Sequence, residues 1–581
     1  MSYSSPRSNR TPAAGFLLTA AFLLSACGGK SADSDALGKD DGILSYIPAD
    51  TPYVMANAEP IDEALLEKMS SEASVMIKSY QRVIDDIIAE DLDELPEDSP
   101  EREELRRGGE IMKRALALLT PDGMREAGLD MNESSALYGH GILPVLRIRL
   151  LDAERFEETI AEFEDALDYE LESAELAGYR YRHLPAEELR IVLGAFGDYV
   201  VLTVAPQSYG DAELTPLVGI EKPARNIAAS GVLEELANEY ELSNHFLGFF
   251  DTEQFATSIM DGQQGVDELF FTDSGFDRED LSDVCREEIM QVAGVMPRMA
   301  FGYRQISLDG VDSTFVLELR EDIAAGLQRL PASVPGLGTD FGGLMSFGFS
   351  VQPKELMDFY AARLDSLEAD PYECDLLGDL QASLEGGRAM LAQPIPPKLN
   401  DFRGLVAIVD ELDVESLMAG VPPMDTDATI VIAVEDAPAL VQMGAAFSPE
   451  LAAMGLEPNG KAMPLEVPQA QMLPAVPYVA LTDNLLAVST GQAAESRISR
   501  AIAADGSDAS TFMSMAVDAA TYYGIMTQSA AMENAAGGAD DARMAMLEAM
   551  QALADVYDRM NFQVRFTERG VEVDSELTFK E

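Results

Sequence analysis

The chain repeats one order of structural elements in its two halves, and this repetition restricts the fold more than any other feature of the sequence. In the first half, residues 145–150 alternate in polarity as a half-buried strand does, and Asp152 follows as a helix N-cap. Apolar side chains then recur at helical spacing, at Phe156, Ile160, Phe163 and Leu167. In the second half, residues 428–434 predict the matching strand and Asp436 the matching cap, 284 residues later.

Three further segments match in the same order. Residues 198–204 match residues 483–489 at an offset of 285, and both predict strands. Each half closes with a predicted hairpin, turned at Gly310 in the first half and at Gly570 in the second. A helix is predicted before each hairpin, with apolar positions offset by 261: Cys285, Ile289, Val292 and Met296 against Met546, Met550, Leu553 and Tyr557. Chance similarity between generic strand–helix segments is the alternative to a duplication.

These matches predict an α+β protein built from two similar tandem halves, each a largely antiparallel sheet with covering helices. The first half is expected at residues 43–325 and the second at residues 344–581. A Gly- and Pro-rich stretch at residues 326–343 is expected to link them. Within the first half, residues 61–119 predict a helical hairpin with an acidic tip.

The composition is that of a folded but very acidic protein. Asp and Glu number 102 against 40 Lys and Arg, which gives a net charge of −62 over 581 residues, while 47% of residues are hydrophobic. Such a surface repels nucleic-acid phosphates and anionic lipid headgroups, so neither is an expected partner. A solvated acidic coat suits a salty exterior or periplasm, where ions screen the self-repulsion. A cation-binding surface is the alternative explanation.

The first 27 residues carry the most specific motif. Two arginines precede an apolar run at residues 16–24, which is too short to span a bilayer, and Leu-Ser-Ala-Cys at residues 24–27 closes it. This order resembles the lipobox of bacterial lipoproteins. The resemblance implies that residues 1–26 are a signal peptide and that Cys27 carries the acyl chains of a membrane anchor. A plain secretory signal that happens to precede a cysteine is the alternative.

The residues after Cys27 refine the expected location. By resemblance to lipoprotein sorting, Gly28 in place of the usual inner-membrane Asp favours the outer membrane, with the protein facing the periplasm. Residues 27–42 predict a flexible tether, and no later segment reaches 18 apolar residues, so the acyl chains are the expected membrane attachment. Residues 43–54, with Pro-Ala-Asp-Thr at 48–51, resemble the start of bacterial envelope-protein families of unknown function. Those families supply no catalytic residues.

The cysteines predict one disulfide. With Cys27 acylated, Cys285 and Cys374 remain as an even pair in an oxidising compartment. We expect a bridge between the halves that closes a loop of about 90 residues and stabilises the fold. Two buried free thiols are the alternative.

Motifs for catalysis, metals and cofactors are missing from the sequence. His140, His183 and His245 lack a zinc-protease pattern, and neither a Ser-x-x-Lys signature nor a nucleophile elbow occurs. Three Cys and three His cannot build a zinc-finger array or an iron–sulfur protein. Four acids offer oxygen ligands for calcium but also suit a solvated helical face: Asp273, Asp277, Asp280 and Asp283. We therefore expect no catalytic residues, no metal and no cofactor.

Methionine is abundant, with 28 in the chain. Eight of them crowd the C-terminal part of the second half: Met513, Met515, Met526, Met532, Met544, Met546, Met550 and Met560. A groove between the halves that these residues line is one hypothesis for a ligand site, and ordinary core filling is the other. The sequence as a whole predicts an outer-membrane lipoprotein with a non-enzymatic binding or interaction role in the cell envelope. A carrier or scavenger of an apolar ligand held between the two lobes and a hydrolase with an unrecognised site are the alternatives.

Overall fold

The computed structural model divides the chain into two compact units. Among the described residues, unit 1 comprises residues 42–248 and Gln305–Leu308, and unit 2 comprises Phe249–Arg304 and residues 309–580. The described residues are 42–94, 96, 99–118, 120–167, 169–186, 188–262, 281–388, 397–412, 426–466, 476–491, 493–524 and 552–580. The expected signal peptide lies outside them, as does the expected tether up to residue 41.

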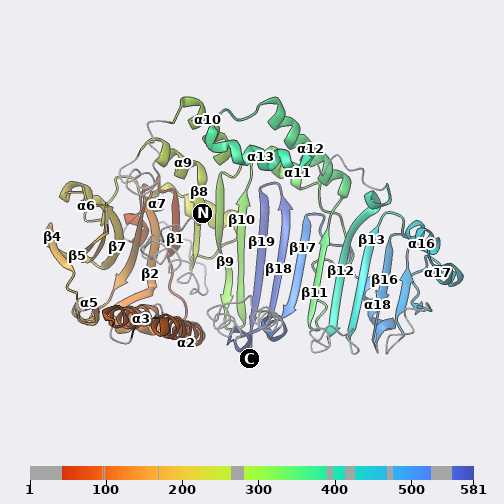
Figure 1. Cartoon of the computed structure of the whole chain (residues 1–581), viewed down its shortest axis with the longest axis horizontal. Coiled ribbons are helices and arrows are strands. Elements are labelled where there is room, and N and C mark those ends of the chain that lie inside the picture. The colour runs from red at the N-terminus through yellow and green to blue at the C-terminus, as the bar shows by residue number, and fades with distance from the viewer. Residues whose placement is uncertain are drawn as a thin grey trace. The chain divides into compact units, whose positions relative to one another are not determined.

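Helices and strands alternate along the chain, so the expected mixed class is confirmed (Figure 1). All 19 described strands are assigned to one large sheet, and their pairings are antiparallel. The boundary between the units falls after Gly248 and not in the segment 326–343. The units therefore do not coincide with the halves expected at residues 43–325 and 344–581, and the tandem arrangement is not confirmed by this division.

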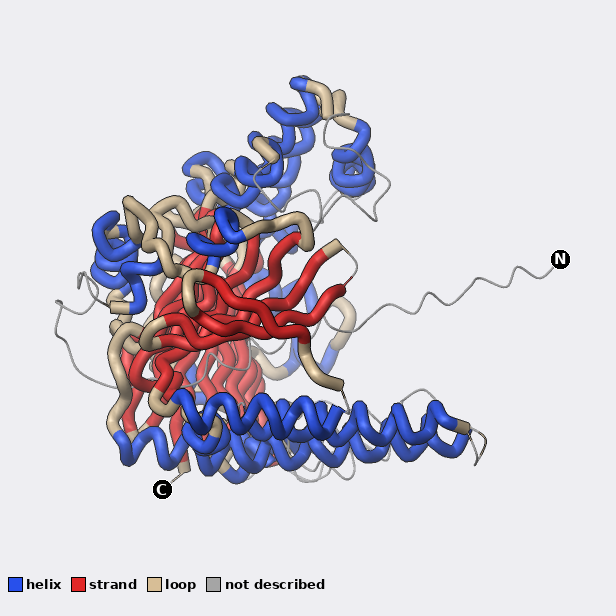
Figure 2. Tube along the Cα trace, turned by 90° about the vertical axis from the view of Figure 1, so that its left-hand side faces the viewer, coloured by secondary structure: helices blue, strands red, loops and turns tan. Residues whose placement is uncertain are grey.

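Unit 1 is built on a sheet of short antiparallel strands. Its described strands pair in the order β4 (Glu172–Leu176), β5 (Tyr179–Ala186), β6 (Leu189–Phe196), β7 (Tyr199–Pro206), β3 (Leu143–Leu150), β2 (Leu129–His140) and β1 (Tyr53–Asn57). Its helices are η1 (Ile43–Tyr46), α2 (Glu63–Glu94), α3 (Pro100–Leu118), α4 (Pro121–Glu126), α5 (Ala153–Leu167), α6 (Asp211–Leu217), α7 (Ile227–Ser230) and α8 (Val232–Tyr240). Figure 2 shows α2 and α3 side by side, as the predicted helical hairpin requires.

The amphipathic helix expected after Asp152 is α5. The Asp152 carboxylate accepts hydrogen bonds from the backbone N–H groups of Glu154 and Arg155, at 3.0 and 3.1 Å, and so begins the helix. Phe156 and Ile160 then lie on the buried side of α5, in one cluster with Ile148 of β3 and Val200 of β7. The spacing of apolar residues therefore places the helix correctly on its sheet.

A buried arginine fastens the beginning of unit 1 to its sheet. Arg147 of β3 is 0% exposed, and its guanidinium carbon lies 4.2 Å from the centroid of the Tyr46 ring. Its Nη2 donates a hydrogen bond of 2.8 Å to the Val218 carbonyl. Lys222 lies 4.3 Å from the same ring centroid. A Cβ on Gly219, where φ is +77°, would come within 2.3 Å of the Arg147 guanidinium, so the site requires glycine.

Unit 2 carries a wider sheet, whose first strand, β9 (Arg298–Ser307), has its last residues, Gln305–Ser307, in unit 1. Its described strands pair in the order β9, β10 (Gly310–Glu318), β19 (Gly570–Phe579), β18 (Tyr557–Thr567), β17 (Thr511–Asp518), β11 (Met345–Ser350), β12 (Phe402–Glu411), β13 (Asp427–Val434), β16 (Leu485–Ser489), β15 (Tyr478–Leu481) and β14 (Met463–Pro464). β8 (Leu247–Asp251) contains the boundary between the units.

The helices of unit 2 are short apart from one. They are α9 (Thr252–Met260), α10 (Asp283–Ala293), α11 (Glu321–Leu327), α12 (Pro353–Ala369), η4 (Asp375–Leu377), α13 (Gly378–Gly386), η5 (Pro397–Asp401), α16 (Ala437–Ala445), α17 (Pro449–Ala453), α18 (Ala494–Ile502) and η7 (Ala552–Asp555). Both predicted closing hairpins are present, as β9–β10 and β18–β19. None of the described helices is long and apolar enough to span a bilayer.

The segment 326–343, expected to be a linker, packs into unit 2. Val334 and Leu337 are 0% and 3% exposed and belong to one core cluster with Ile498 of α18. The Asp340 carboxylate pairs with Arg559 of β18, and the backbone N–H of Gly338 donates to the Ser514 hydroxyl at 2.9 Å. The Gly and Pro residues that suggested a linker thus form an irregular segment that is fixed against the sheet.

Candidate functional site

Cys285 and Cys374 form a disulfide within unit 2. Cys285 lies in the first turn of α10, and Cys374 is buried just before η4. Their Cα atoms are 4.7 Å apart across a sequence separation of 89. The predicted pairing is therefore present. Both cysteines belong to unit 2, so the bridge lies inside one compact unit, and it joins residues from the two halves expected at 43–325 and 344–581.

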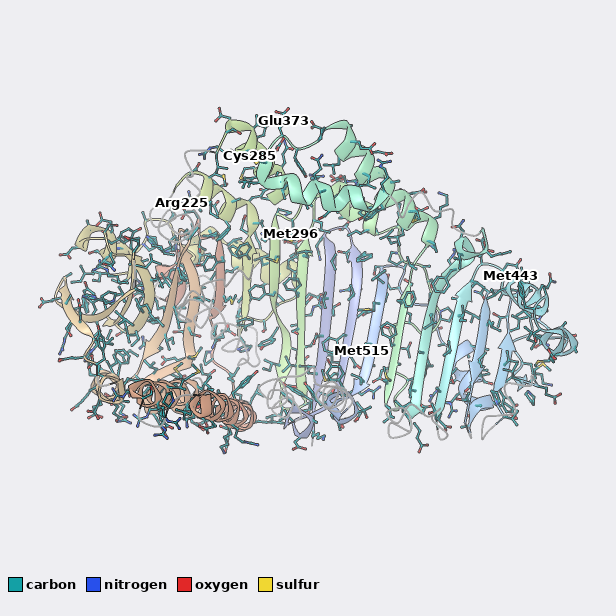
Figure 3. The ribbon with its side chains drawn as sticks, viewed as in Figure 1. Arg225, Cys285, Met296, Glu373, Met443 and Met515 are labelled. Atoms are coloured by element: carbon teal, nitrogen blue, oxygen red, sulfur yellow. A yellow bond between two sulfur atoms is a disulfide. The ribbon has the colours of Figure 1, made fainter. Side chains whose placement is uncertain are left out.

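A carboxylate on α10 also binds the segment that contains Cys374. Glu288, one turn after Cys285 on α10, accepts hydrogen bonds from the backbone N–H groups of Glu373 and Cys374, both at 2.9 Å. Figure 3 shows Cys285 and Glu373 in this region of the structure. One carboxylate that bridges two successive amides fixes the direction of the segment carrying Cys374. The disulfide therefore acts as a structural clasp between α10 and η4.

The sheet of unit 2 presents two chemically different faces. On one face, directly paired residues form a continuous apolar row across nine strands. Along the strand order from β10 to β15 the row is Phe315, Val573, Val564, Met513, Phe349, Leu405, Ile432, Leu486 and Leu481. The adjacent row on this face adds Phe562, Met515, Phe347, Ala407 and Ile430. We call the surface formed by these two rows the apolar face.

The opposite face of the same strands is polar near β10 and apolar near β13. Its paired residues from β10 to β11 are Asp312, Glu576, Asn561, Ala516 and Ser346, with Thr314, Asp574, Gln563, Ser514 and Gly348 beside them. We call these residues the polar face. From β12 onward the same side is apolar, and Val406, Ile408 and Val431 are buried in one cluster with Ile498 of α18.

On two strands, a side chain of the apolar face is more exposed than its neighbours on the opposite side of the sheet, whereas the apolar face of a sheet is usually the covered one. On β10, Thr314 and Val316 are 3% and 0% exposed, whereas Phe315 between them is 39% exposed. On β13, Thr429 and Val431 are 0% and 1% exposed, whereas Ile430 is 45% exposed. The described residues therefore cover the apolar face only in part.

The helices of unit 2 explain this incomplete cover. In Figure 1, α10, α12 and α13 lie beyond one end of the central strands and not over their middle. α16 does pack on the apolar face, but at its edge, where Leu440 and Val441 join one cluster with Ile432 and Leu486. On β17 and β18, Met515 and Phe562 pack against a cluster that contains Tyr523 and Ala554 of η7, so described residues cover this part of the apolar face and leave Phe315 and Ile430 exposed.

The polar face has a hollow of about 240 Å³. Its lining residues are Asp312, Gly338, Thr339, Asp340, Ser346, Ser514, Met515, Ala516, Asn561, Phe562, Gln563, Asp574, Ser575 and Glu576. Burial alone would raise the pKa of Asp340, but hydrogen bonds from Arg559 and from the Gly342 N–H lower it below its ordinary value. Asp340 therefore stays ionised, and Arg559 balances its charge at the edge of the hollow.

Asp312 and Asp574 occupy contrasting positions in this hollow. Asp574 accepts hydrogen bonds from Arg304 at 2.5 Å, Thr314 at 2.9 Å and Arg565 at 2.9 Å. The Asp312 carboxylate makes no hydrogen bond to another described side chain, and Asp312 lies directly opposite Glu576. Burial raises the pKa of Asp312, Arg304 opposes that rise, and the neighbouring Asp574 and Glu576 add to it. The hollow thus combines a well-paired carboxylate with one that binds a proton more readily than usual.

The three histidines singled out in the sequence lie on separate parts of unit 1. His140 lies on β2, His183 on β5 and His245 before β8. Burial lowers the pKa of His140, although Asp50 opposes this, and burial also lowers the pKa of His245. No group of three or more His, Cys, Asp or Glu side chains in the described part of the chain is arranged to hold a metal ion.

Several predicted site residues lie outside the described residues. These are Cys27, the acids Asp273, Asp277 and Asp280, and the methionines Met526, Met532, Met544, Met546 and Met550. Asp283 is described and is exposed at the beginning of α10. Of the methionines, Met513 and Met515 lie on the apolar face, and Met560 lies on the same side of β18, where it is buried in one cluster with Tyr523 and Ala554.

Sequence reasoning missed both faces of the unit 2 sheet. The available signal was the alternation of aromatic and small residues at 345–350 and of acidic and apolar residues at 570–579. That alternation defines two faces but does not reveal which strands are neighbours. No family model, curated protein or solved structure matches this chain.

Proposed function

We propose that the protein is a lipid-anchored outer-membrane protein with a non-enzymatic interaction role, and that the apolar face of unit 2 binds another protein of the cell envelope. The observation that carries the interaction is the exposure of Phe315 on β10 and of Ile430 on β13, two large apolar side chains that face outward between buried neighbours. Exposed apolar surface on a protein is costly in water and marks a site of association.

The size and shape of the apolar face favour a protein partner. From β10 to β13 the strand order has six steps, and at about 4.8 Å per step the surface is about 29 Å wide. It is the face of an open sheet, so it suits a broad complementary surface rather than the enclosed pocket in which a small ligand loses most of its exposure.

The sequence of the first 27 residues supports the proposed location. A lipobox ending at Cys27 implies acyl chains, and Gly28 favours the outer membrane, with the protein facing the periplasm. The disulfide between Cys285 and Cys374 agrees with an oxidising compartment. The acidic coat suits the same aqueous, salt-containing environment.

Site-specific photo-cross-linking in cells tests the apolar face. A photoreactive phenylalanine analogue replaces Phe315 or, in a second strain, Ile430, because both side chains are exposed and their replacement leaves the core intact. The matched control is Leu376 of η4, which is 55% exposed but not on the sheet. We expect the same cross-linked protein from both face positions and none from the control. Failure of both face positions, or equal cross-linking at all three, would contradict the proposal.

The carrier of an apolar ligand is a second candidate for the same face. The mixture of Met513, Met515, Phe347 and Phe349 is soft and adaptable, which suits acyl chains as well as a protein. Lipid extraction of the native protein, followed by mass spectrometry, distinguishes a lipid carrier from a protein-binding role. A stoichiometric lipid that disappears with Phe349→Ser would favour the carrier, whereas lipid-free protein together with a protein cross-link favours the partner.

The anchor is tested separately. Cys27→Ser removes the sulfur that the acyl chain would occupy, so we expect the protein to leave the membrane fraction and to keep its fold. A matched Ser25→Ala variant retains the small-residue lipobox and should remain in the membrane fraction. Membrane retention of the Cys27→Ser protein would contradict the anchor without affecting the interaction proposal.

We also infer that the chain arose by tandem duplication. The inference is supported by two equivalent sets of paired strands, β1–β2–β3–β7 and β11–β12–β13–β16. In each set helices connect the first two strands, and a capped helix follows the third. The two caps, Asp152 and Asp436, hold equivalent positions and make equivalent hydrogen bonds to backbone N–H groups. The boundary of the compact units does not coincide with the boundary of the repeat, because the units are defined by contacts between residues and not by common ancestry.

A further inference from the structure

The segment that contains α16 and α17 has unusually few charged side chains for this protein. Residues 437–456 contain one charged side chain, Glu450, although 24% of the whole chain is charged. The surface helix α5, in contrast, carries seven charged side chains among its 15 residues. A helix that is apolar on all sides is normally buried on all sides.

One side of this segment is buried against the sheet. Leu440, Val441 and Leu456 pack with the buried Val434, Ala437 and Leu481 at the edge of the apolar face. Asp436 caps α16 by accepting a hydrogen bond of 2.9 Å from the Ala439 N–H. Ser448 caps α17 by accepting one of 3.3 Å from the Leu451 N–H. The segment is therefore fixed to unit 2 and is not a loose loop.

The other side is exposed and apolar. Phe447, between the two helices, is 88% exposed, and Met443 on α16 is 44% exposed. Figure 3 shows Met443 at the outer edge of unit 2. The exposed residues around them include the small or uncharged Gln442, Ala446, Ala452 and Ala453, and Glu450 is the one charged side chain exposed among residues 437–456. We call these residues, with Met443 and Phe447, the α16–α17 tip.

We propose that the α16–α17 tip inserts into the surface of a zwitterionic lipid bilayer. A nearly fully exposed phenylalanine between two helices is convex, and a bilayer accepts a convex apolar tip without the matching groove that a protein partner would need. The tip has no Lys or Arg to attract anionic lipid, and the charge of −62 on the chain repels such lipid, so uncharged headgroups fit best.

The contact is weak on its own and effective on a tethered protein. Burial of one phenylalanine raises partition into the bilayer by about 10- to 100-fold. On a chain already held at a membrane, as the proposed anchor implies, the local lipid concentration is high enough for such an affinity to matter. The insertion itself needs no acyl chain, so it is tested without one.

The absence of tryptophan from the chain makes the test direct. Residues 28–581 are prepared without an acyl chain and with the Cys285–Cys374 disulfide intact, and Phe447→Trp introduces a single fluorophore. With phosphatidylcholine vesicles we expect a blue shift of the emission and quenching by brominated acyl chains. The matched control, Leu376→Trp, is also at an exposed apolar position and should show neither change.

A second measurement follows binding without a fluorophore. Phe447→Ser should reduce co-sedimentation with phosphatidylcholine vesicles by about 10-fold or more, and anionic phosphatidylglycerol should weaken the binding of the unsubstituted protein. An unchanged emission with vesicles overturns the proposal, as does tighter binding to anionic vesicles. A blue shift that depends on protein concentration in the absence of vesicles also overturns it, because it assigns the tip to a second copy of the chain. Because no acyl chain is present, none of these results depends on the anchor.

Discussion

Arg147 is a fully buried cation in an acidic protein. Its guanidinium is completely buried, and its Nε and Nη1 atoms have no hydrogen-bond partner among the described residues. The Tyr46 ring and the Val218 carbonyl stabilise the charge in place of a carboxylate. A buried charge without a counter-ion costs free energy. Packing of the aliphatic stem of Arg147 against its neighbours offsets part of this cost.

Substitution of Arg147 separates its packing from its charge. Arg147→Ala should destabilise unit 1 by about 2–5 kcal/mol, because it leaves a cavity beside Tyr46. Arg147→Met keeps most of the stem and removes the buried charge, so it should stay close to the original stability. Urea denaturation measures both free energies of unfolding. Equal destabilisation by the two substitutions would instead assign the stability to the cation–π contact and the hydrogen bond.

Asp312 predicts a pH effect with a definite sign. Because its pKa is raised in the folded state, mainly by burial, the stability linked to Asp312 is present at acid pH and is lost as pH rises through that raised pKa. Asp312→Asn should therefore raise the melting temperature at pH 7, and the gain should vanish below pH 3.8. Thermal melts from pH 3 to 8 measure this. Asp574→Asn is the contrasting variant and should lower the melting temperature at pH 7, because Asp574 is paired with Arg304 and Arg565.

At the scale of single elements, local patterns predict well and long-range neighbours do not. The caps Asp152 and Asp436 were predictable because a cap is decided by the residues next to it. The hairpin of β18 and β19 was predictable from Gly570 between two alternating segments. The polar and apolar faces were not, because β11 lies between β12 and β17, and β17 is about 160 residues away from β11 along the chain.

The clasp between α10 and η4 predicts a stability change confined to unit 2. A disulfide that closes a loop with a separation of 89 is worth about 4–5 kcal/mol in the chain-entropy model. Cys285→Ala combined with Cys374→Ala should therefore lower the melting temperature of unit 2. The Glu288→Gln variant keeps the disulfide and should have a smaller effect. Differential scanning calorimetry measures both, and an unchanged melting temperature in the double variant would contradict a structural role for the bond.

The capping aspartate of α16 predicts a smaller change. Asp436→Ala removes the hydrogen bond to the Ala439 N–H and should cost about 1 kcal/mol, while Asp436→Asn keeps an acceptor and should cost less. Hydrogen exchange should show faster exchange in α16 and α17 of the alanine variant than in β13. Equal exchange in both variants would show that packing of Leu440 alone holds the helix.

At the scale of the whole molecule, charge dominates the solution behaviour. A net charge of −62 on 581 residues destabilises the compact state through self-repulsion, and salt screens it. The melting temperature should rise by a few degrees when NaCl is raised from 0.01 to 0.5 M at pH 7. Sucrose at matched osmolality serves as a control for preferential exclusion. A melting temperature that falls with salt would show that local ion pairs such as Arg304–Asp574 outweigh the net repulsion.

The segment expected to be a linker shows where prediction from composition ends. Residues 326–343 contain enough Gly and Pro to suggest a linker, yet Val334 and Leu337 are buried in the core of unit 2. Their burial depends on α18, which is more than 150 residues further along the chain. A high content of Gly and Pro indicates that a segment can adopt irregular backbone conformations. Whether that segment is buried depends on residues far away in the sequence, here those of α18.

The pairing of β10 with β19 has a consequence for how the chain is made. Thr314 and Asp574 are neighbours in the sheet although 260 residues separate them in the sequence. A ribosome therefore delivers β10 long before it delivers the strand that pairs with it. Until β19 emerges, β10 has an open edge and an exposed Phe315, which together form a template for aggregation. Closure of this sheet is a late event in biogenesis, and a holding chaperone would act during that interval.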